Sequence, residues 1–131
     1  MTACWHGAII ARGVLLAAMV LAVAACQQEG VPAEHRIVDG DPERGRAAIV
    51  AIGCGACHHV PGVRGAHGVV GPSLDAFGHR KLIGGVMPNE PTILVQWVQD
   101  APSLIPETGM PDLPLSQAQA RDIAAYLYTL R

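Results

Sequence analysis

Residues 54 to 58 read Cys54-Gly55-Ala56-Cys57-His58, which is a C-x-x-C-H motif. Two thiols at this spacing reach the two vinyl groups of one porphyrin, and the adjacent imidazole then lies beneath the iron. We therefore expect one covalent c-type haem, attached through Cys54 and Cys57, with His58 as an axial ligand of the iron.

Two other uses of a C-x-x-C pair agree less well with the rest of the chain. A structural zinc site needs four ligands, and no second cysteine pair follows between Cys57 and Arg131. A thioredoxin-like dithiol belongs to a βαβ unit, and the flanks of the motif hold no convincing strand pattern. The remaining cysteines, Cys4 and Cys26, lie in a different segment. The cysteine pattern favours haem.

The amino-terminal segment has the features of an export signal. An uncharged apolar run from Gly13 to Ala25 follows a stretch whose only charge is Arg12. Such a run is typical of a signal-peptide core and is short for a membrane-spanning helix. It ends in Val23-Ala24-Ala25-Cys26, which resembles the lipobox of bacterial lipoproteins.

We therefore expect residues 1–25 to be a lipoprotein-type signal peptide and Cys26 to carry a lipid that tethers the protein to a membrane. A lipidated Cys26 also explains an odd cysteine in an oxidising compartment. Ordinary cleavage near Ala25, or an uncleaved anchor extending back through Arg12, are the alternatives. All three interpretations predict that the domain is exported. A lipid-anchored protein would lie on the periplasmic side of a bacterial membrane, and the alternative is a soluble periplasmic protein.

The mature chain is mildly acidic and poor in aromatic residues. Removal of residues 1–25 takes away Arg12 and no acid, which leaves eight basic and eleven acidic side chains and a formal charge of −3. No basic patch points to nucleic acid or to anionic lipid. The few aromatic side chains left are Phe77, Trp97, Tyr126 and Tyr128. A buried porphyrin would supply the apolar bulk that the core lacks.

Helix signals occur at three places. Asp41 is a suitable N-cap with Pro42 after it, and this predicts a helix to about Gly53. A second helix is expected from Asn89 or Glu90 to about Asp100, with its apolar stripe on the following residues: Ile93, Leu94, Trp97 and Val98. The last helix is expected from a Ser116 cap, with Gln119 completing a capping box, to Arg131.

The segments between these helices are irregular. Residues 26–40, comprising the lipidated cysteine and a polar stretch, are predicted to be a flexible linker. The glycine-rich stretch 59–85 is predicted to be a long loop that haem organises, and residues 101–114 hold four prolines and should not form regular helix. We find no strand signal beyond isolated valines. The domain is therefore expected to be all-α and to comprise residues 41–131.

The iron needs a second axial ligand on the face opposite His58. The candidates are Met87, Met110, His59, His67 and His79. His59 is adjacent to the proximal ligand and cannot reach around the ring. Met110 is the best choice, because it lies far along the chain in a proline-stiffened loop between two helices. Met87, or a histidine such as His67 or His79, is the alternative.

Over residues 41–131 the chain resembles class I cytochromes c. Besides the attachment motif, Gly71-Pro72-Ser73-Leu74 matches the family's G-P-x-L and Gly109-Met110-Pro111 matches its distal M-P. The resemblance implies three main helices and long loops wrapped around one haem. It implies that the Pro72 carbonyl accepts the ring N–H of His58. It also implies that Gly45 and Ile49 cross Tyr126 and its neighbours.

Within that family the chain is most similar to cytochrome c domains associated with subunit II of haem–copper oxidases. The similar stretches are Gly85 to Pro91, Trp97, Pro106 to Pro111 and Ala125-Tyr126-Leu127. In that pattern the position of Met87 is commonly another apolar residue, which argues against Met87 as a ligand. The lysine ring with which mitochondrial cytochrome c docks is absent, and Lys81 is the only lysine.

Trp97 and Arg64 are candidates to hydrogen-bond haem propionates, as a tryptophan and an arginine do in related folds. Trp97 is also compatible with a core position on the second helix. Arg64 is equally compatible with a solvated loop position.

These observations predict an electron carrier and not an enzyme. The expected partners are redox proteins, namely a haem–copper oxidase as acceptor and a quinol-oxidising complex as donor, together with the membrane through Cys26. Two alternatives from other classes are open: a peroxidase-like enzyme or gas sensor in which Met110 dissociates, and a structural cytochrome subunit of an oxidase complex.

Overall fold

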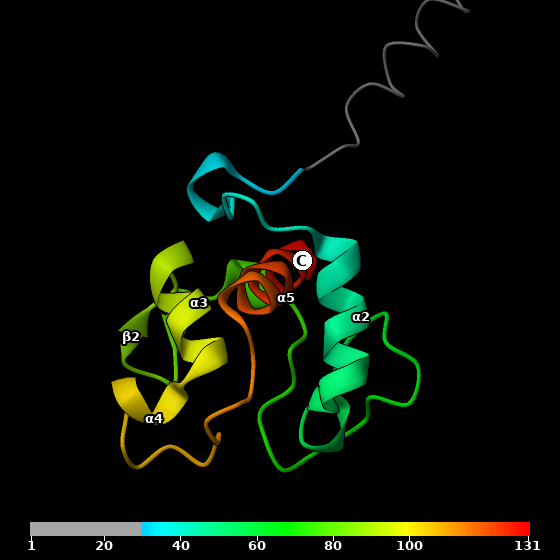
Figure 1. Cartoon of the computed structure of the whole chain (residues 1–131), viewed down its shortest axis with the longest axis vertical. Helices are drawn as coiled ribbons and strands as arrows, with labels where there is room; N and C mark the ends of the chain where they lie inside the picture. The colour runs from blue at the N-terminus through cyan, green and yellow to red at the C-terminus, as the bar shows by residue number, and fades with distance from the viewer. Residues whose placement is uncertain (1–29) are drawn as a thin grey trace, which may run out of the picture. The chain divides into compact units, whose positions relative to one another are not determined.

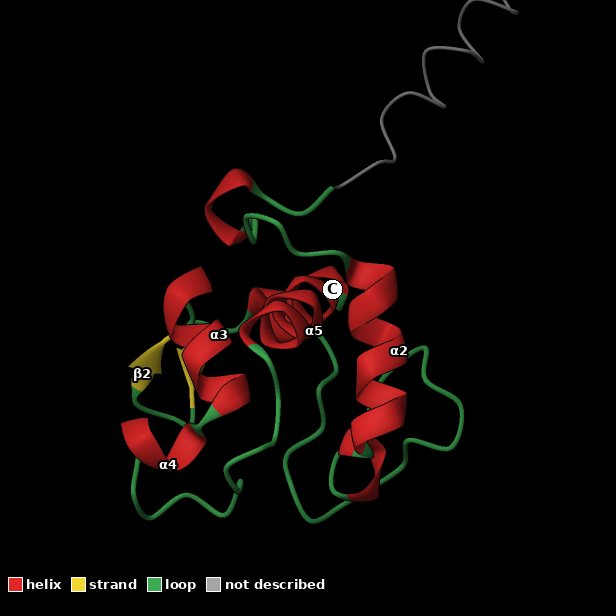
Figure 2. Ribbon diagram, viewed as in Figure 1, coloured by secondary structure: helices red, strands yellow, loops and turns green. Residues whose placement is uncertain are grey.

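Helices account for most of the regular structure of residues 30–131, which are the residues that the computed structural model describes. The elements are η1 (Ala33–His35), α2 (Pro42–Ile52), η2 (Cys54–Ala56), η3 (Phe77–His79), β1 (Leu82–Ile83), β2 (Met87–Pro88), α3 (Pro91–Gln99), α4 (Ala101–Leu104) and α5 (Gln117–Thr129). The α5 helix lies between α2 and α3 and contacts both (Figures 1 and 2). The predicted all-α fold with three main helices and long loops is confirmed.

The predicted signal peptide and Cys26 lie outside the described residues. Within residues 30–131, no helix combines the length and the apolar character needed to cross a membrane. Residues 31–131 form one compact unit.

The α2 helix begins and ends where the capping residues predict. The Asp41 side chain accepts a hydrogen bond from the Arg44 backbone N–H at 2.9 Å, and Pro42 occupies the first helical turn. The helix ends at Gly53, whose φ of +86° is left-handed backbone that glycine adopts without strain. This ending directs the chain straight into the cysteine turn.

The α5 helix has the predicted capping box. The Ser116 hydroxyl accepts from the Gln119 backbone N–H at 3.3 Å, and the Gln119 side-chain oxygen accepts from the Ser116 N–H at 3.0 Å. The helix ends at Thr129, two residues before the expected end at Arg131. Its buried face comprises Ala120, Ile123, Ala124, Leu127 and Tyr128 among others.

A close crossing of α2 over α5 explains the glycine inside α2. A Cβ atom on buried Gly45 would lie 1.9 Å from the Asp122 carbonyl oxygen, so only glycine allows this approach. Beside the crossing, the buried Asp122 carboxylate accepts from Arg44 Nε at 2.8 Å and from the Asp41 backbone N–H at 2.8 Å. The hydrogen bond with the Arg44 guanidinium lowers the pKa of Asp122.

The expectation that residues 101–114 hold no regular helix is wrong for the first four. Residues 101–104 form α4, with Pro102 in the first turn, where its missing N–H would have had no helical partner. Asp100 caps the helix, because its side chain accepts from the Ser103 N–H at 3.1 Å.

The expectation of no strands is also wrong, on a small scale. β1 and β2 pair antiparallel, with Ile83 opposite Met87. Gly84 and Gly85 make the turn between them with φ of +57° and +83°. Strands of two residues are too short to produce an alternating pattern in the sequence.

The predicted linker does not extend to residue 40, because residues 31–40 pack on the domain. Ile37 is 8% exposed and belongs to the core, and the His35 ring stacks on Tyr128 with centroids 4.3 Å apart. A Cβ on Gly40 would lie 2.9 Å from the Arg121 carbonyl oxygen, so this segment also lies against the start of α5. One buried apolar residue, Ile37, and one stacked ring, His35, give no periodic pattern. The sequence of this segment therefore predicted a linker.

The long loop after the cysteine turn contributes to the core. Val60, Val63, Ala66 and Phe77 from this region are all buried in the same cluster as the helix side chains. The loop is therefore anchored by protein contacts of its own, in addition to any that a bound cofactor would add.

Candidate functional site

The attachment motif forms a tight turn directly after α2. The backbone N–H groups of Cys57 and His58 both donate to the Cys54 carbonyl oxygen, at 3.2 and 3.0 Å. Cys54 is half-buried, Cys57 is exposed, and both thiols are free. Burial raises the pKa of the Cys54 thiol. The turn, which carries both cysteines and His58, follows the lower end of α2 in Figure 1.

The His58 ring is held in one orientation. Its Nδ1 atom lies 2.7 Å from the Pro72 carbonyl oxygen, which is the contact expected from the sequence. A carbonyl oxygen only accepts hydrogen bonds, so Nδ1 carries the proton and Nε2 keeps its lone pair for a metal. Gly71 makes room for the ring, because a Cβ there would lie 2.3 Å from His58 Cε1.

Gly68 is a site residue that the sequence analysis did not single out. Its N–H donates to the His58 and Gly55 carbonyl oxygens at 3.2 and 3.1 Å. A Cβ on Gly68 would lie 2.4 Å from the carbonyl carbon of Cys57. This glycine therefore presses the following loop onto the attachment turn. Its only signal in the sequence was membership of a glycine-rich stretch.

Met110 is half-buried in the segment between α4 and α5. Its N–H donates to the Thr108 hydroxyl at 3.3 Å. This segment and the cysteine turn both lie at the lower end of the domain in Figure 1. The structure thus keeps Met110 outside regular helix, as the sequence predicts for a ligand-bearing loop.

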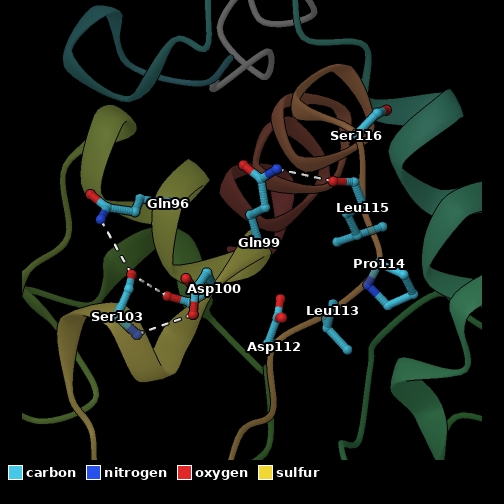
Figure 3. A pocket seen from close by; sticks show the side chains of 9 residues that line it. All are labelled: Gln96, Gln99, Asp100, Ser103, Asp112, Leu113, Pro114, Leu115 and Ser116. Atoms are coloured by element: carbon cyan, nitrogen blue, oxygen red, sulfur yellow. Dashed lines mark hydrogen bonds between the residues drawn. The ribbon is translucent and has the colours of Figure 1, made fainter.

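The chain that follows Met110 is fastened to α3 by Gln99. The Gln99 side-chain amide donates to the Leu115 carbonyl oxygen at 3.0 Å, and the Gln99 carbonyl oxygen accepts from the Leu113 N–H at 3.0 Å. Figure 3 shows this contact in a groove lined by polar side chains of α3, by Ser103 of α4 and by residues 112–116. Gln99 was not among the residues singled out in the sequence, because a polar residue at a helix end is usually solvated.

The other candidates for the second iron ligand differ in their burial and in their contacts. Met87 is half-buried on β2. His59 and His67 are joined by an isolated β-bridge, and their rings stack with centroids 5.6 Å apart. His59 also lies 3.5 Å from an Asp75 carboxylate oxygen, and His79 is exposed at the end of η3. The two histidines nearest the motif are therefore engaged with each other.

Trp97 and Arg64 lie on different parts of the fold. The half-buried Trp97 ring packs against the β1–β2 turn, since a Cβ on Gly84 would lie 2.9 Å from Trp97 Cη2 and 2.8 Å from Ile105 Cδ1. Arg64 is exposed in the loop after the attachment turn. Their roles toward propionates stay predictions.

The donor set and its surroundings fit a haem. Two free thiols and an oriented imidazole occupy one turn. Several large apolar side chains at the edge of the core are only half-buried, which leaves apolar surface for a flat apolar group to cover: Ile52, Leu74, Met87, Ile93, Trp97 and Leu113. Across the described residues, no group of three or more His, Cys, Asp or Glu side chains is arranged to hold a metal ion.

Comparison with known proteins agrees with this geometry. The family model described as Cytochrome c matches residues 42–131. A stretch of 89 residues is 33% identical to a protein named Cytochrome c oxidase subunit 2 from Alkalihalophilus pseudofirmus. That stretch covers 67% of this chain and 25% of the oxidase subunit, so the similarity concerns about a quarter of that protein's length.

Proposed function

Because the chain belongs to the cytochrome c family and its haem c is covalent, we propose that it is a respiratory electron carrier that passes single electrons to a terminal oxidase. Haem-based electron transfer follows from the family. The bound haem supplies one-electron chemistry between ferrous and ferric iron. The observation that carries the proposal is the attachment turn with its oriented histidine.

In this proposal each site residue has a separate task. Cys54 and Cys57 would hold the haem through thioether bonds, and His58 would bind the iron through Nε2. The Pro72 carbonyl oxygen fixes the His58 ring and raises its basicity through the 2.7 Å contact. Met110 would be the second protein ligand of the haem iron. A neutral, soft thioether favours ferrous iron, so the reduction potential is fairly high.

The protein does no bond chemistry of its own. With His58 and Met110 both bound, the haem iron would have no open position for peroxide or a gas, and the hydrogen bond from Gln99 to the Leu115 carbonyl oxygen would oppose dissociation of Met110. Trp97 and Arg64 hydrogen-bond the propionates.

We propose that the carrier is lipid-anchored through Cys26 on the periplasmic side of a bacterial membrane. A tether raises the effective concentration of the carrier near membrane partners, so tight docking is unnecessary. The acceptor is a haem–copper oxidase, which the similarity to an oxidase subunit supports. The donor is a quinol-oxidising complex.

Reoxidation of the reduced protein in its own membranes tests this function. We expect oxygen-dependent reoxidation that cyanide, an inhibitor of haem–copper oxidases, abolishes. Heated membranes provide the control for spontaneous oxidation by oxygen. If cyanide leaves the rate unchanged, the oxidase proposal fails; if the protein reacts with carbon monoxide as fast as open-site haem proteins do, the carrier proposal fails as well.

A further inference from the structure

Arg46 closes a ring of chain that contains the whole attachment motif. It lies on α2, and its guanidinium donates through Nε and Nη2 to the Gly62 carbonyl oxygen, at 3.0 and 2.7 Å. The two residues are sixteen positions apart, and Cys54, Cys57 and His58 all lie between them. A guanidinium is planar, so two of its donors directed at one oxygen restrict the orientation as well as the length of the contact. A side chain thus joins the body of the helix to the chain beyond the turn.

Tyr126 holds the neighbouring carbonyl group from the other helix of the crossing. Its hydroxyl donates to the Pro61 carbonyl oxygen at 2.6 Å, and the residue is 8% exposed on α5. Gly62 has a φ of +74°, and a Cβ atom there would lie 2.9 Å from the Tyr126 hydroxyl. Two consecutive carbonyl groups are therefore fastened to α2 and α5, the two helices that cross.

The far end of the same loop rests on the attachment turn. A Cβ on Gly55, in the middle of the motif, would lie 2.7 Å from both Cα and Cβ of Ala66. The Gly68 N–H donates to the carbonyl oxygens of Gly55 and His58. We name residues 60–68 the bracket loop, because they connect the crossed helices at one end to the turn at the other.

The bracket loop is closed on itself between these two ends. The Val60 N–H donates to the Ala66 carbonyl oxygen at 3.0 Å, and the Val63 N–H donates to the Val60 carbonyl oxygen at 3.2 Å. The side chains of Val60, Val63 and Ala66 are buried in the core. A packed loop of this kind moves as one piece, so a restraint at its first residues also acts on its last ones.

We propose that Arg46 and Tyr126 are positioning residues, which hold the attachment turn in place through the bracket loop while the iron changes its oxidation state. This inference rests on the proposed electron-carrier function. Electron transfer is fast when the iron and its ligands hardly move between the ferrous and ferric states, and the protein supplies that restraint. The Pro72 carbonyl oxygen restrains the His58 ring, whereas the bracket loop restrains the His58 backbone.

Arg46→Gln and Tyr126→Phe, each in the haem-loaded protein, remove the two contacts separately. Tyr126→Phe keeps the ring and the net charge. The control for the loss of one positive charge is Arg36→Gln, at an exposed arginine ahead of α2. In the reduced protein we expect the Gly68 amide hydrogen to exchange about fivefold faster or more in both variants, because its bonds to the turn open more often. The control should match the wild type.

Two further measurements separate positioning from a general loss of stability. The Leu94 amide of α3, which donates to the Glu90 carbonyl oxygen at 2.8 Å, is the reference for hydrogen exchange and should keep its rate. In the oxidised protein, the paramagnetically shifted NMR signals of the haem methyl groups report the position of the His58 ring. We expect these signals to move in both variants and to stay in place in the control. Equal acceleration at Gly68 and Leu94, with unmoved haem signals, would show a role in stability alone and would overturn the proposal.

Neither readout depends on an oxidase. If the protein does not reduce an oxidase while both variants still accelerate Gly68 exchange and move the haem signals, the proposed acceptor is wrong and the positioning role stands. If Gly68 exchange and the haem signals match the wild type in both variants, Arg46 and Tyr126 do not position the turn, whatever the electron acceptor is.

Discussion

At the scale of single residues, the surroundings of the two methionines support the proposal that Met110, and not Met87, binds the iron. Met110 lies outside helix and strand, in a segment fastened to α3 by Gln99. Met87 lies on a strand and packs against the core, where a methionine serves as apolar filling.

Met110→Ala should therefore keep the haem attached, open the sixth position of the iron and lower the reduction potential. Met87→Ala, the matched control, should change none of these. The weak sulfur-to-iron absorption band of the oxidised protein and a redox titration measure the effect. Persistence of that band in Met110→Ala would disprove the ligand assignment.

The buried carboxylate of Asp122 gives a prediction for pH. The hydrogen bond with the Arg44 guanidinium holds the pKa of Asp122 below its ordinary value, which is about 3.9 in an unfolded chain. The ionised Asp122 carboxylate therefore contributes its full stabilisation above about pH 4. This contribution is lost as the pH falls through the lower pKa that Asp122 has in the folded protein. We expect the free energy of unfolding to decrease below about pH 4 in the wild type.

Asp122→Asn should be less stable than the wild type at neutral pH, and its stability should depend less on pH in the acidic range. Denaturant titrations at several pH values would show this. Equal acid sensitivity in the two proteins would mean that other carboxylates dominate acid unfolding.

At the scale of elements, the crossing of α2 and α5 predicts that two reverse substitutions in one helix, Gly45→Ala and Ala47→Gly, both destabilise the domain, for different reasons. Gly45→Ala should destabilise the domain by about 1–3 kcal/mol or more, because the added Cβ would lie 1.9 Å from the Asp122 carbonyl oxygen and force the helices apart. This loss outweighs the gain of about 1 kcal/mol in helix propensity. The control Ala47→Gly, at an exposed position of α2, should destabilise by about 1 kcal/mol through propensity alone. A stabilised Gly45→Ala protein would contradict the crossing.

The fastening of the Met110 segment is a second element-scale prediction. Gln99→Ala removes the hydrogen bond to the Leu115 carbonyl oxygen and leaves that acceptor without its partner. The sulfur-to-iron band should then disappear at a lower temperature than in the wild type, while the haem stays attached. Gln96→Ala is the control, because Gln96 is exposed and its contact with Ser103 is long, at 3.4 Å. Identical melting of the band in both variants would remove Gln99 as a positioning residue.

The sequence predicted the elements whose signals are local and missed those that depend on tertiary contacts. Helix α2 was predictable from Asp41, Pro42 and Gly53, because caps act through hydrogen bonds to neighbours in the chain. The stacking of His35 on Tyr128 joins residues far apart in sequence and gives no pattern. Within the site, the C-x-x-C-H motif predicted the attachment turn, because all of its residues are adjacent in the chain.

At the scale of the whole molecule, the packed segment 31–40 and the attachment turn lie at opposite ends of α2. The segment leads into the first residue of α2, and the attachment turn follows the last residue of α2. The eleven residues of the helix therefore separate the segment from the turn by about 16 Å. Figure 1 shows η1 and the attachment turn at opposite ends of the domain. The proposed anchor at Cys26 would therefore join the domain at the end of α2 opposite the attachment turn.

The last prediction concerns that anchor. Cys26→Ser should move the protein from the membrane fraction to the soluble fraction, because it removes the thiol that we propose carries the lipid. The haem spectrum and the melting temperature should stay unchanged, since the contacts of Ile37 and His35 that close the domain lie after residue 30. Membrane fractionation and mass spectrometry of the amino terminus measure the result, with Gln27→Ser as the control that keeps the cysteine. If Cys26→Ser stays in the membrane fraction, or the native terminus bears no lipid, another segment anchors the protein.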